Sequence, residues 1–276
     1  MSYKPSDFLF QAGNSEISNA MKSADNRDRL FHYTNFDALV SILKNKNLKF
    51  NRIDKVNDMS EKLYLNDPEI ISKVFVCCFT NRISEYIPHW YMYSKDVYGI
   101  RIEIKKSPEV PLAECLFDES RPVEAYRNGE AVETYGILNK DHSKIIVNKD
   151  WSIDLKATDV IYGEKYKKEN PIILNINNEK KVDLLPVGVI KDIAWDFEKE
   201  TRIIAFPRTL NDDVLFSECD FLLVPVKWNK IESITITCGP WMTQSLKETV
   251  KEICASYLDG INFSVKNSKH DKAIQR

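Results

Sequence analysis

Glycine is scarce in this chain and widely spaced. Only eight of the 276 residues are glycine, less than half the usual share of about 7%. No two of them lie closer than seven residues, at positions 13, 99, 129, 136, 163, 188, 239 and 260. Glycine-rich phosphate loops need closely spaced glycines, because the backbone itself must approach the phosphate. The sequence therefore excludes a Rossmann dinucleotide fingerprint and a P-loop, and a nucleotide would have to be held by side chains.

The charges of the chain nearly cancel, with 39 Lys and Arg against 41 Asp and Glu. Nucleic-acid-binding domains usually carry a basic stripe, whereas the basic excess here is confined to 266–276, which we interpret as a solvated tail. No apolar run approaches the roughly 18 residues that cross a bilayer, and the first residues lack the apolar core of a signal peptide. Six cysteines without a C-x-x-C pair fit a reducing compartment, and no histidine lies near a cysteine. We therefore expect a cytoplasmic protein with no membrane contact and no bound metal.

The hydrophobic pattern predicts one α+β domain. Apolar alternation or short apolar runs predict strands at 48–53, 74–79, 98–105, 221–226, 231–237 and 261–265. Helical spacing of apolar residues predicts helices at 38–46 and 241–258. We interpret 1–28 as an N-terminal arm, 29–265 as the domain, 118–181 as a weakly patterned insertion and 266–276 as a basic tail. Many strands, with few helices that do not alternate with them, indicate the α+β class.

Two aromatic segments are candidates for ligand binding. His32 and Tyr33 end a short predicted strand just before a helix, where a pair of core rings is the commoner role. Residues 88–94 are rich in rings, and on a helix Trp90 and Tyr93 share a face. Such a face packs in a core, or stacks on a flat ring such as nicotinamide or a base.

The segment 195–202 concentrates charge. As a strand it places Asp196, Glu198, Glu200 and Arg202 on one face. A solvated strand face is the simpler interpretation, but like charges at adjacent positions repel, and we expect Arg202 to pair with one of the acids. A carboxylate held in this way can stabilise positive charge that develops on a sugar.

A second set of charged residues suggests a different chemistry. Asp96 precedes the predicted strand 98–105, which contains Glu103 and Lys105. An Asp followed by Glu-x-Lys is the layout of a metal-dependent nuclease, in which the carboxylates hold Mg²⁺ and the lysine helps to activate water. Short matches of this kind are common in a chain that is 29% charged, and a surface strand face is the commoner explanation.

An ordered series of short motifs resembles the bacterial domain-of-unknown-function family 2971. The series runs from about Leu30 to Val265 and consists of Phe31-His-Tyr-Thr34, Phe50, Val56-Asn-Asp58 with Glu61, Cys78-Phe-Thr80, Trp90-x-x-Tyr93, Gly99, Trp195-x-x-Glu198-x-Glu200-x-Arg202 and Ile236-Thr-Cys-Gly-Pro240. The order and spacing of the motifs are more specific than any one of them. The chain departs from the family at Cys238, where members often carry an aliphatic residue, and at Met59, where they often carry proline.

That family in turn resembles the ADP-ribosyltransferases, including toxins of bacterial antiphage systems. The resemblance implies an ADP-ribosyltransferase-like split β-sandwich with flanking helices, which holds NAD⁺ in a cleft without a glycine-rich loop. It also implies the NAD-site residues: His32 on the adenosine ribose with Tyr33 and Thr34 beside it, Thr80 steadying the site, Tyr93 or Trp90 stacked on nicotinamide, and Arg202 paired with a catalytic glutamate.

The resemblance assigns catalysis to Glu200 or Glu198, which would bind the nicotinamide-ribose hydroxyl and favour an oxocarbenium-like transition state. Nicotinamide is already a cationic leaving group, so catalysis reduces to positioning plus a carboxylate near the developing charge. In other transferases the last Glu of E-x-E is catalytic, which favours Glu200, with Glu198 orienting the acceptor.

The function implied by the resemblance is an NAD-dependent mono-ADP-ribosyltransferase, a toxin-like effector of antiphage defence. Its partners would be NAD, an RNA, DNA or protein acceptor, and a neutralising antitoxin. Two alternatives stay open: the metal-dependent nuclease of Asp96, Glu103 and Lys105, and a non-catalytic nucleotide-sensing or interaction module.

Overall fold

A computed structural model describes most of the chain, namely residues 8–9, 15–58, 61, 70, 73–94, 98–107, 109–118, 120–134, 137–138, 145–147, 151–163, 173–176, 178–184, 186–209 and 219–271. The chain divides into two compact units. The first unit comprises 1–25, 48–78 and 117–225, and the second comprises 26–47, 79–116 and 226–276. Both units combine strands with helices that do not alternate with them, which confirms the predicted α+β class.

The second unit is built on four neighbouring strands. Their order is β18 (Phe263–Asn267), β17 (Ser233–Cys238), β5 (Gly99–Lys105) and β2 (Arg29–Asn35). The first pair is parallel and the other two pairs are antiparallel. Three of these strands, β5, β17 and β18, were predicted from apolar alternation, and each lies within about two residues of its expected bounds.

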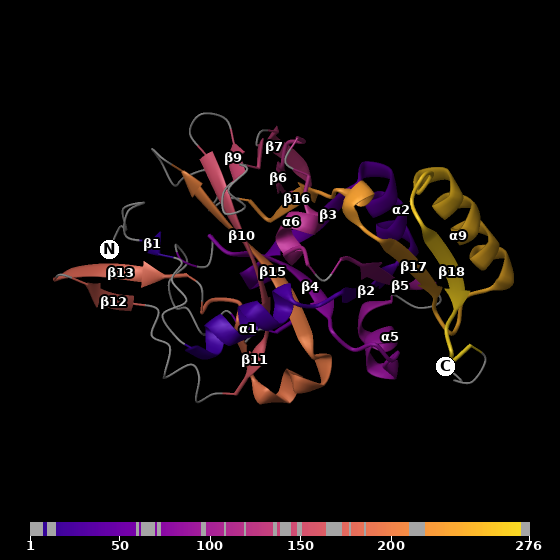
Figure 1. Ribbon diagram of the computed structural model, residues 1–276, viewed down its shortest axis with the longest axis horizontal. Helices are drawn as coiled ribbons and strands as arrows, with labels where there is room; N and C mark the ends of the chain where they lie inside the picture. The colour runs from indigo at the N-terminus through magenta and orange to yellow at the C-terminus, as the bar shows by residue number, and fades with distance from the viewer. Residues whose placement is uncertain are drawn as a thin grey trace. The chain divides into compact units, whose positions relative to one another are not determined.

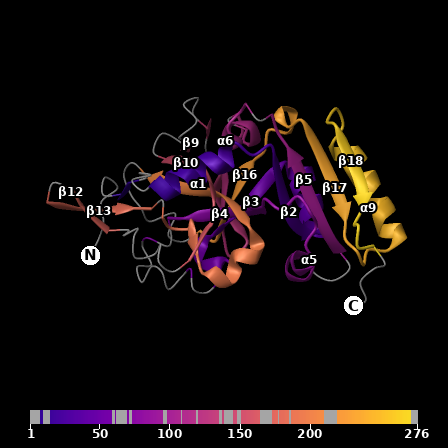
Figure 2. The same ribbon diagram turned by 60° about the horizontal axis from the view of Figure 1, so that its bottom comes forward.

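Helices accompany these strands: α2 (Phe36–Asn45), α5 (Ile87–Tyr93), α6 (Leu112–Leu116) and α9 (Gln244–Tyr257), with a 3₁₀ turn at Trp228–Lys230. Helix α9 lies along β18 in both views (Figures 1 and 2). Thr243 caps it by accepting a hydrogen bond from the Leu246 N–H, and Val250 and Cys254 are buried. The helical spacing of apolar residues therefore predicted both α2 and α9.

Two of the scarce glycines meet in the second unit. The Gly239 N–H donates to the carbonyl oxygen of Gly99 at 2.8 Å. A Cβ on Gly239 would lie 2.8 Å from that oxygen, and a Cβ on Gly99 would lie 2.6 Å from Cβ of Ser94. Glycine at these two positions therefore allows segments of the protein to approach each other closely.

The first unit holds most of the strands. They are β1 (Phe8–Leu9), β3 (Asn47–Arg52), β4 (Phe75–Thr80), β6 (Glu124–Arg127), β7 (Glu130–Thr134), β8 (Ile137–Leu138), β9 (Ile145–Val147), β10 (Trp151–Asp159), β11 (Ile161–Tyr162), β12 (Ile173–Ile176), β13 (Glu179–Asp183), β14 (Ile190–Lys191), β15 (Glu200–Thr209) and β16 (Phe221–Pro225). The start of β3 and the end of β4 extend into the second unit. Strand β15 is antiparallel to β10 along the whole of β10, and β14 is parallel to β11.

Two segments with weak sequence patterns are ordered in this unit. The expected arm contains helix α1 (Ser15–Asp25), which contacts β10 and buries Ile17 and Ala24 (Figure 1). The expected insertion at 118–181 contains β10, the main partner of β15. Long-range pairing with β15 orders β10, and such pairing leaves little local signal in a sequence. The domain boundaries stay predictions.

Helix α1 belongs to an apolar core in the first unit. Its members are Ile17, Ile53, Ile70, Val74, Val76, Val182, Leu184, Val187, Val189, Ile190, Ile204 and Phe206. Strands β14 and β15 contribute to this core, so the polar side chains on these strands are attached to a rigid backbone. Within the described part of the chain, no helix combines the length and apolar composition needed to cross a bilayer.

Candidate active site

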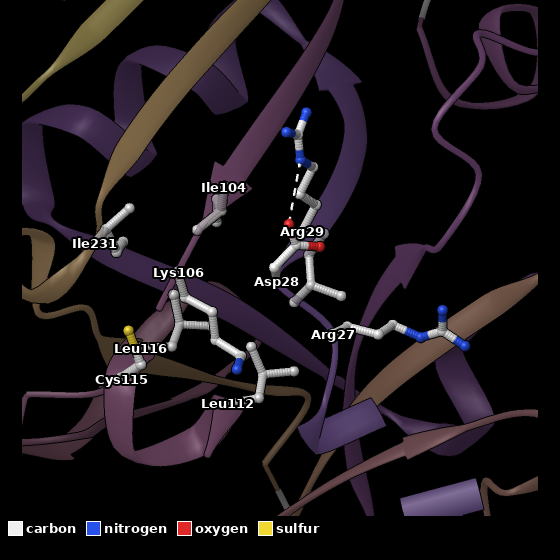
Figure 3. A pocket seen from close by; sticks show the side chains of 10 residues that line it. Arg27, Asp28, Arg29, Ile104, Lys106, Leu112, Cys115, Leu116 and Ile231 are labelled. Carbon is white, nitrogen blue, oxygen red and sulfur yellow. Dashed lines mark ion pairs between the residues drawn. The ribbon is translucent and has the colours of Figure 1, made fainter. Parts of the chain in front are cut away.

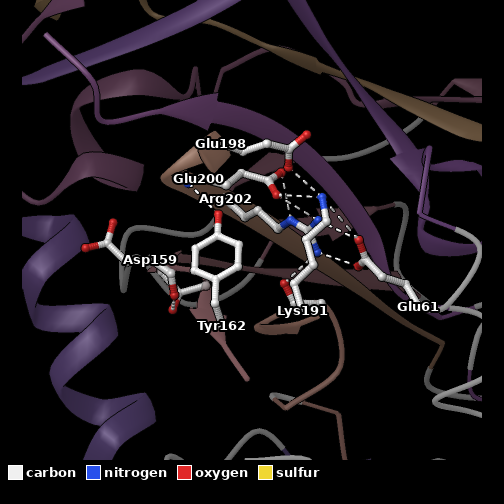
Figure 4. A network of polar contacts seen from close by, with 9 residues as sticks. Glu61, Asp159, Tyr162, Lys191, Glu198, Glu200 and Arg202 are labelled. Atoms are coloured by element: carbon white, nitrogen blue, oxygen red, sulfur yellow. Dashed lines mark hydrogen bonds and ion pairs between the residues drawn. The ribbon is translucent and has the colours of Figure 1, made fainter. Parts of the chain in front are cut away.

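A buried network of charged side chains lies in the first unit, around the start of β15 (Figure 4). Glu200 and Arg202 project from the same face of this strand. The Arg202 Nε and Nη2 donate to the two carboxylate oxygens of Glu200, each at 2.9 Å. The same guanidinium donates to both oxygens of Glu61, at 2.6 and 2.8 Å, and to the Gly188 carbonyl at 2.9 Å. These five bonds use every N–H of the side chain, so the predicted pairing of Arg202 with an acid is confirmed.

Lys191 is the second cation of this network. Its Nζ lies 2.6 Å from Glu198 Oε2, 3.3 Å from Glu200 Oε2 and 3.7 Å from Glu61 Oε1. The same nitrogen lies 4.5 Å from the centroid of the Trp195 ring, within the range of a cation–π contact. Figure 4 shows Lys191 and Arg202 lying among the three glutamates.

Burial sets the electrostatics of this cluster. Burial by itself would raise the pKa of Glu200, but the charges of Arg202 and Lys191 and the hydrogen bonds from Arg202 and the Cys78 thiol outweigh it and lower the pKa to about 2. Burial would lower the pKa of Arg202, yet Glu200 and Glu61 raise it well above the ordinary value. Burial, followed by the charge of Glu200, raises the pKa of the Cys78 thiol. Glu200 is therefore ionised and Cys78 is a thiol at neutral pH.

Neighbouring polar groups fix the strand that carries Glu200. The Glu200 N–H donates to the Tyr162 hydroxyl at 2.8 Å. The Thr201 hydroxyl donates to Asp159 at 2.6 Å, and the Ser23 hydroxyl of α1 donates to the same carboxylate at 2.7 Å. The first residues of β15 are thus held by β10, β11 and α1 together.

The structure corrects the interpretation of 195–202 as one strand. A 3₁₀ helix, Ile193–Glu198, precedes β15, and Lys199 joins the two with a left-handed backbone (φ 44°). Glu198 therefore ends a helix and does not share a strand face with Glu200. The two glutamates are linked through Lys191, whose Nζ donates to both. Asp196 pairs instead with Lys199 near the surface. The alternation of charges led to the wrong prediction, because the local sequence does not show that a residue other than glycine adopts a left-handed backbone.

The predicted NAD-site aromatics gather in the second unit. The Tyr33 ring lies 4.8 Å from that of Trp90 and 4.9 Å from that of His89, centroid to centroid. Its hydroxyl accepts a hydrogen bond from the Tyr86 N–H at 3.3 Å. The start of α5 is thereby joined to the end of β2, where Thr34 is also buried. The structure brings the His-Tyr-Thr motif together with the Trp-x-x-Tyr motif.

Thr80 and His32 complete this cluster. Thr80 ends β4 opposite Phe31 of β2, and its hydroxyl accepts a hydrogen bond from the Arg82 N–H at 3.2 Å. His32 lies beside Phe79, at 5.5 Å between ring centroids, and is half-buried. His32 is therefore partly accessible to solvent, whereas Tyr33, Thr34 and Thr80 are buried.

Burial separates the two candidates for stacking on nicotinamide. Trp90 is only 1% exposed, and its Nε1 donates to Glu85 at 3.2 Å. Tyr93 is half-buried and lies at the end of α5, with its ring 5.9 Å from that of His89. Trp90 is thus a core side chain, and the more accessible Tyr93 is the better candidate.

Two of the three residues of the nuclease alternative, Glu103 and Lys105, are placed by the structure. Asp96 lies outside the described residues. Glu103 pairs with Arg29 at 3.0 Å, and Lys105 pairs with Glu232. Among the residues that the structure describes, no group of three His, Cys, Asp or Glu side chains is placed to hold a metal ion. Ion pairing across neighbouring strands explains these charges.

Two members of the buried network were not assigned roles from the sequence. Glu61 belongs to the motif series, but its bond to Arg202 spans 141 positions. Lys191 lies in no motif, and its two-residue strand has no local pattern. Because buried charges require counter-ions, only a search for a cation beside Glu198 and Glu200, and for an acid beside Arg202, could have suggested these residues.

The second unit contains a small hollow. Its lining is Arg27, Asp28, Arg29, Leu30, Ile104, Lys106, Leu112, Cys115, Leu116 and Ile231 (Figure 3). It has room for about one water molecule. None of the predicted site residues lines it, and it cannot hold a nucleotide.

The comparisons with known proteins give a weak structural likeness. No family model and no curated protein matches the chain, so membership of family 2971 is not confirmed. Structures of Thermus sp. 2.9 DarT are similar at 12% identity, each covering 88% of this chain: the complex with NAD⁺ (TM-score 0.33, 96% of that chain), with carba-NAD⁺ (0.30, 96%) and with ADP-ribosylated ssDNA (0.31, 94%). A likeness of this size carries no argument about activity, for which only the chain's own residues count.

Proposed function

We propose that this chain is an NAD⁺-dependent ADP-ribosyltransferase. The observation that supports it most is the Glu-x-Glu-x-Arg segment, in which Glu200 is held ionised by Arg202 and Lys191 on a rigid strand. An oxocarbenium-like transition state gains most from a fixed negative charge in a low-dielectric site. Glu200 in this segment supplies such a charge, which supports the proposal.

The residues proposed to bind NAD⁺ are those that the resemblance implies. Half-buried His32 hydrogen-bonds the adenosine ribose, and Tyr33 and Thr34 keep the end of β2 in place beside it. Thr80 holds the following turn through its bond to the Arg82 N–H. Tyr93 stacks on nicotinamide, since Trp90 is buried in the core.

The proposed reaction breaks the bond between nicotinamide nitrogen and C1′ of its ribose. Nicotinamide leaves with the electron pair, and the acceptor's nucleophilic atom bonds to C1′ and loses its proton. Glu200 binds the ribose hydroxyl and stabilises the positive charge that develops on the sugar, while Glu198 orients the acceptor. The rate gain then comes from positioning and electrostatics.

The burial of the two glutamates places a condition on this mechanism. Their side chains are only 3% and 6% exposed, for Glu198 and Glu200 respectively. A ribose hydroxyl can reach a carboxylate oxygen of either glutamate only if the side chains that cover it move. Productive binding of NAD⁺ therefore includes a rearrangement of side chains around the network.

The acceptor, the biological role and the partners are further parts of the proposal. The near-neutral charge of the chain favours an acceptor recognised through few contacts, such as an unpaired base of RNA or DNA, or a protein side chain. A toxin of antiphage defence that acts in the cytoplasm needs a neutralising antitoxin. Capture of a neutralising partner together with the full chain would test that role.

Label transfer from NAD⁺ tests the proposed activity. Purified protein is incubated with labelled NAD⁺ and cell extract, with and without EDTA. The proposal predicts transfer that survives EDTA and is lost in Glu200→Gln and Glu198→Gln, with the folded fraction of each variant measured by circular dichroism. Mg²⁺-dependent cleavage of nucleic acid that is lost in Glu103→Ala would instead identify the nuclease. NAD⁺ binding without turnover would identify the sensing module.

A further inference from the structure

Lys191 occupies the centre of the carboxylate cluster. Its Nζ lies within 4 Å of all three glutamates, at 2.6 Å from Glu198, 3.3 Å from Glu200 and 3.7 Å from Glu61. Arg202, by contrast, donates to Glu200 through Nε and Nη2 and to Glu61 through Nη1 and Nη2. Lys191 therefore joins Glu198 to the rest of the network.

The backbone around Lys191 makes it a rigid support. It belongs to β14, where it is paired with Tyr162 of β11. The Tyr162 hydroxyl accepts the Glu200 N–H, so the same strand pair places both Lys191 and the start of β15. The Trp195 ring covers Nζ from the 3₁₀ helix that ends at Glu198. The ammonium group is thus fixed from three directions relative to the candidate catalytic carboxylates.

The charge balance of the cluster depends on this lysine. Three buried carboxylates face two buried cations, and the side chain of Lys191 is only 5% exposed. Without Lys191, a single guanidinium would face three carboxylates in a low-dielectric interior. Like charges in such a site cannot all stay ionised, and one acid takes up a proton. The groups that face Lys191 are Glu61, Glu198, Glu200, Arg202 and the Cys78 thiol.

We propose that Lys191 is a positioning residue of the active site, which holds Glu198 beside Glu200 and keeps both carboxylates ionised. This inference rests on the proposed transferase activity. In this proposal Lys191 does not contact NAD⁺, because its ammonium group is directed at the carboxylates of Glu61, Glu198 and Glu200. Its removal should therefore change the rate of reaction at saturating NAD⁺ more than it changes the apparent affinity.

The test compares Lys191→Met with a matched control, Lys247→Met. Lys247 is also 5% exposed and is paired with a carboxylate, Asp271, at 2.8 Å, but it lies on α9 of the second unit. For Lys191→Met we expect kcat to fall on the order of 100-fold with little change in KM for NAD⁺, because small displacements of catalytic groups cost about this much. The control should lose stability without a change in kcat per folded molecule.

The pH profile is a readout that a purely structural role would not move. In Lys191→Met one carboxylate has its pKa raised, so kcat should fall as the pH drops from 8 to 6, whereas the wild type should not change in this way. Lys191→Arg restores a cation and should restore the wild-type profile. Folded Lys191→Met with wild-type kcat and pH profile would overturn the proposal.

A double variant covers the case in which Lys191→Met does not fold. Lys191→Met combined with Glu198→Gln removes one charge of each sign, and we expect it to fold and to show the same pH dependence of unfolding as Glu198→Gln alone. Failure of this variant to fold would mean that packing, and not charge, is the role of Lys191, and would overturn the proposal.

A failure of the proposed transferase activity can be distinguished from a failure of the inference about Lys191. If the wild type transfers no label from NAD⁺, the transferase and the catalytic part of this inference both fall. The influence of Lys191 on the carboxylates is then still measured by unfolding at pH 5 and pH 8. Lys191→Met should lose more stability at pH 8, because an acid whose pKa is raised in the folded state costs stability as the pH rises through that pKa. Equal losses at the two pH values would overturn that part as well.

Discussion

Replacing Arg202 by methionine removes the side chain that binds two of the three buried glutamates. Four of its five hydrogen bonds go to carboxylate oxygens and one goes to a carbonyl. Each charged bond gains about 1.5–3 kcal/mol, but most of that sum offsets the cost of burying the guanidinium. Removing one partner of a buried ion pair instead costs about 3–5 kcal/mol, because the other charge is left uncompensated. Lys191 still lies near both acids, so we expect about 3 kcal/mol for Arg202→Met.

The pH dependence of this loss identifies its cause. In the wild type the pKa of Glu200 is lowered to about 2. The stability that this carboxylate contributes is present above its ordinary pKa and is lost as the pH falls toward 2. In Arg202→Met burial dominates and raises the pKa of Glu200. Such a group loses stability as the pH rises through its folded-state pKa, so the deficit of the variant should be larger at pH 8 than at pH 5.

Urea unfolding followed by tryptophan fluorescence measures both quantities. Glu200→Gln with Arg202→Met provides the control, because it removes the stranded charge together with its partner. It should regain part of the loss at pH 8. The reasoning is refuted if Arg202→Met costs less than about 1 kcal/mol, the range of an exposed ion pair, or if its deficit is the same at both pH values.

Three further predictions concern other parts of the chain. Gly239→Ala should lower the free energy of unfolding by about 1–3 kcal/mol, since its Cβ would lie 2.8 Å from the Gly99 carbonyl oxygen; an unchanged urea midpoint would contradict the close contact. Tyr93→Ala should raise KM for NAD⁺ with little loss of stability, whereas Trp90→Ala should cost about 3–5 kcal/mol in unfolding, and the reverse pattern would exchange their roles. Burial raises the pKa of Cys254 to about 12, so this thiol should react with Ellman's reagent only after unfolding, as mass spectrometry of the native and unfolded chains would show.

The sequence predicted those elements whose pattern is local. Strand β5 alternates apolar and polar residues, and α9 repeats apolar residues at helical spacing, so both were found near their true bounds. Strand β10 was missed, because its order comes from pairing with β15, some fifty positions away. The start of β15 was placed too early, because Lys199 adopts a left-handed backbone without being glycine.

In the candidate site, too, the sequence predicted what is local and missed what depends on tertiary contacts. Glu198, Glu200 and Arg202 were found because they are close in sequence, and the expected ion pair is present. The partners Glu61 and Lys191 complete the network through tertiary contacts that no local pattern reveals. Trp90 and Tyr93 are equivalent in a helical pattern, and only their burial in the fold distinguishes them.

The central claim is that Glu200 provides the fixed negative charge for transfer of ADP-ribose from NAD⁺. The most direct measurement is transfer of label from NAD⁺ by the wild type and by Glu200→Gln, expressed per folded molecule and with NAD⁺ binding measured in parallel. We predict that the wild type transfers label in the presence of EDTA, and that Glu200→Gln still binds NAD⁺ but loses transfer on the order of 100-fold or more. Undiminished transfer by folded Glu200→Gln, or no transfer by the wild type, would contradict the claim.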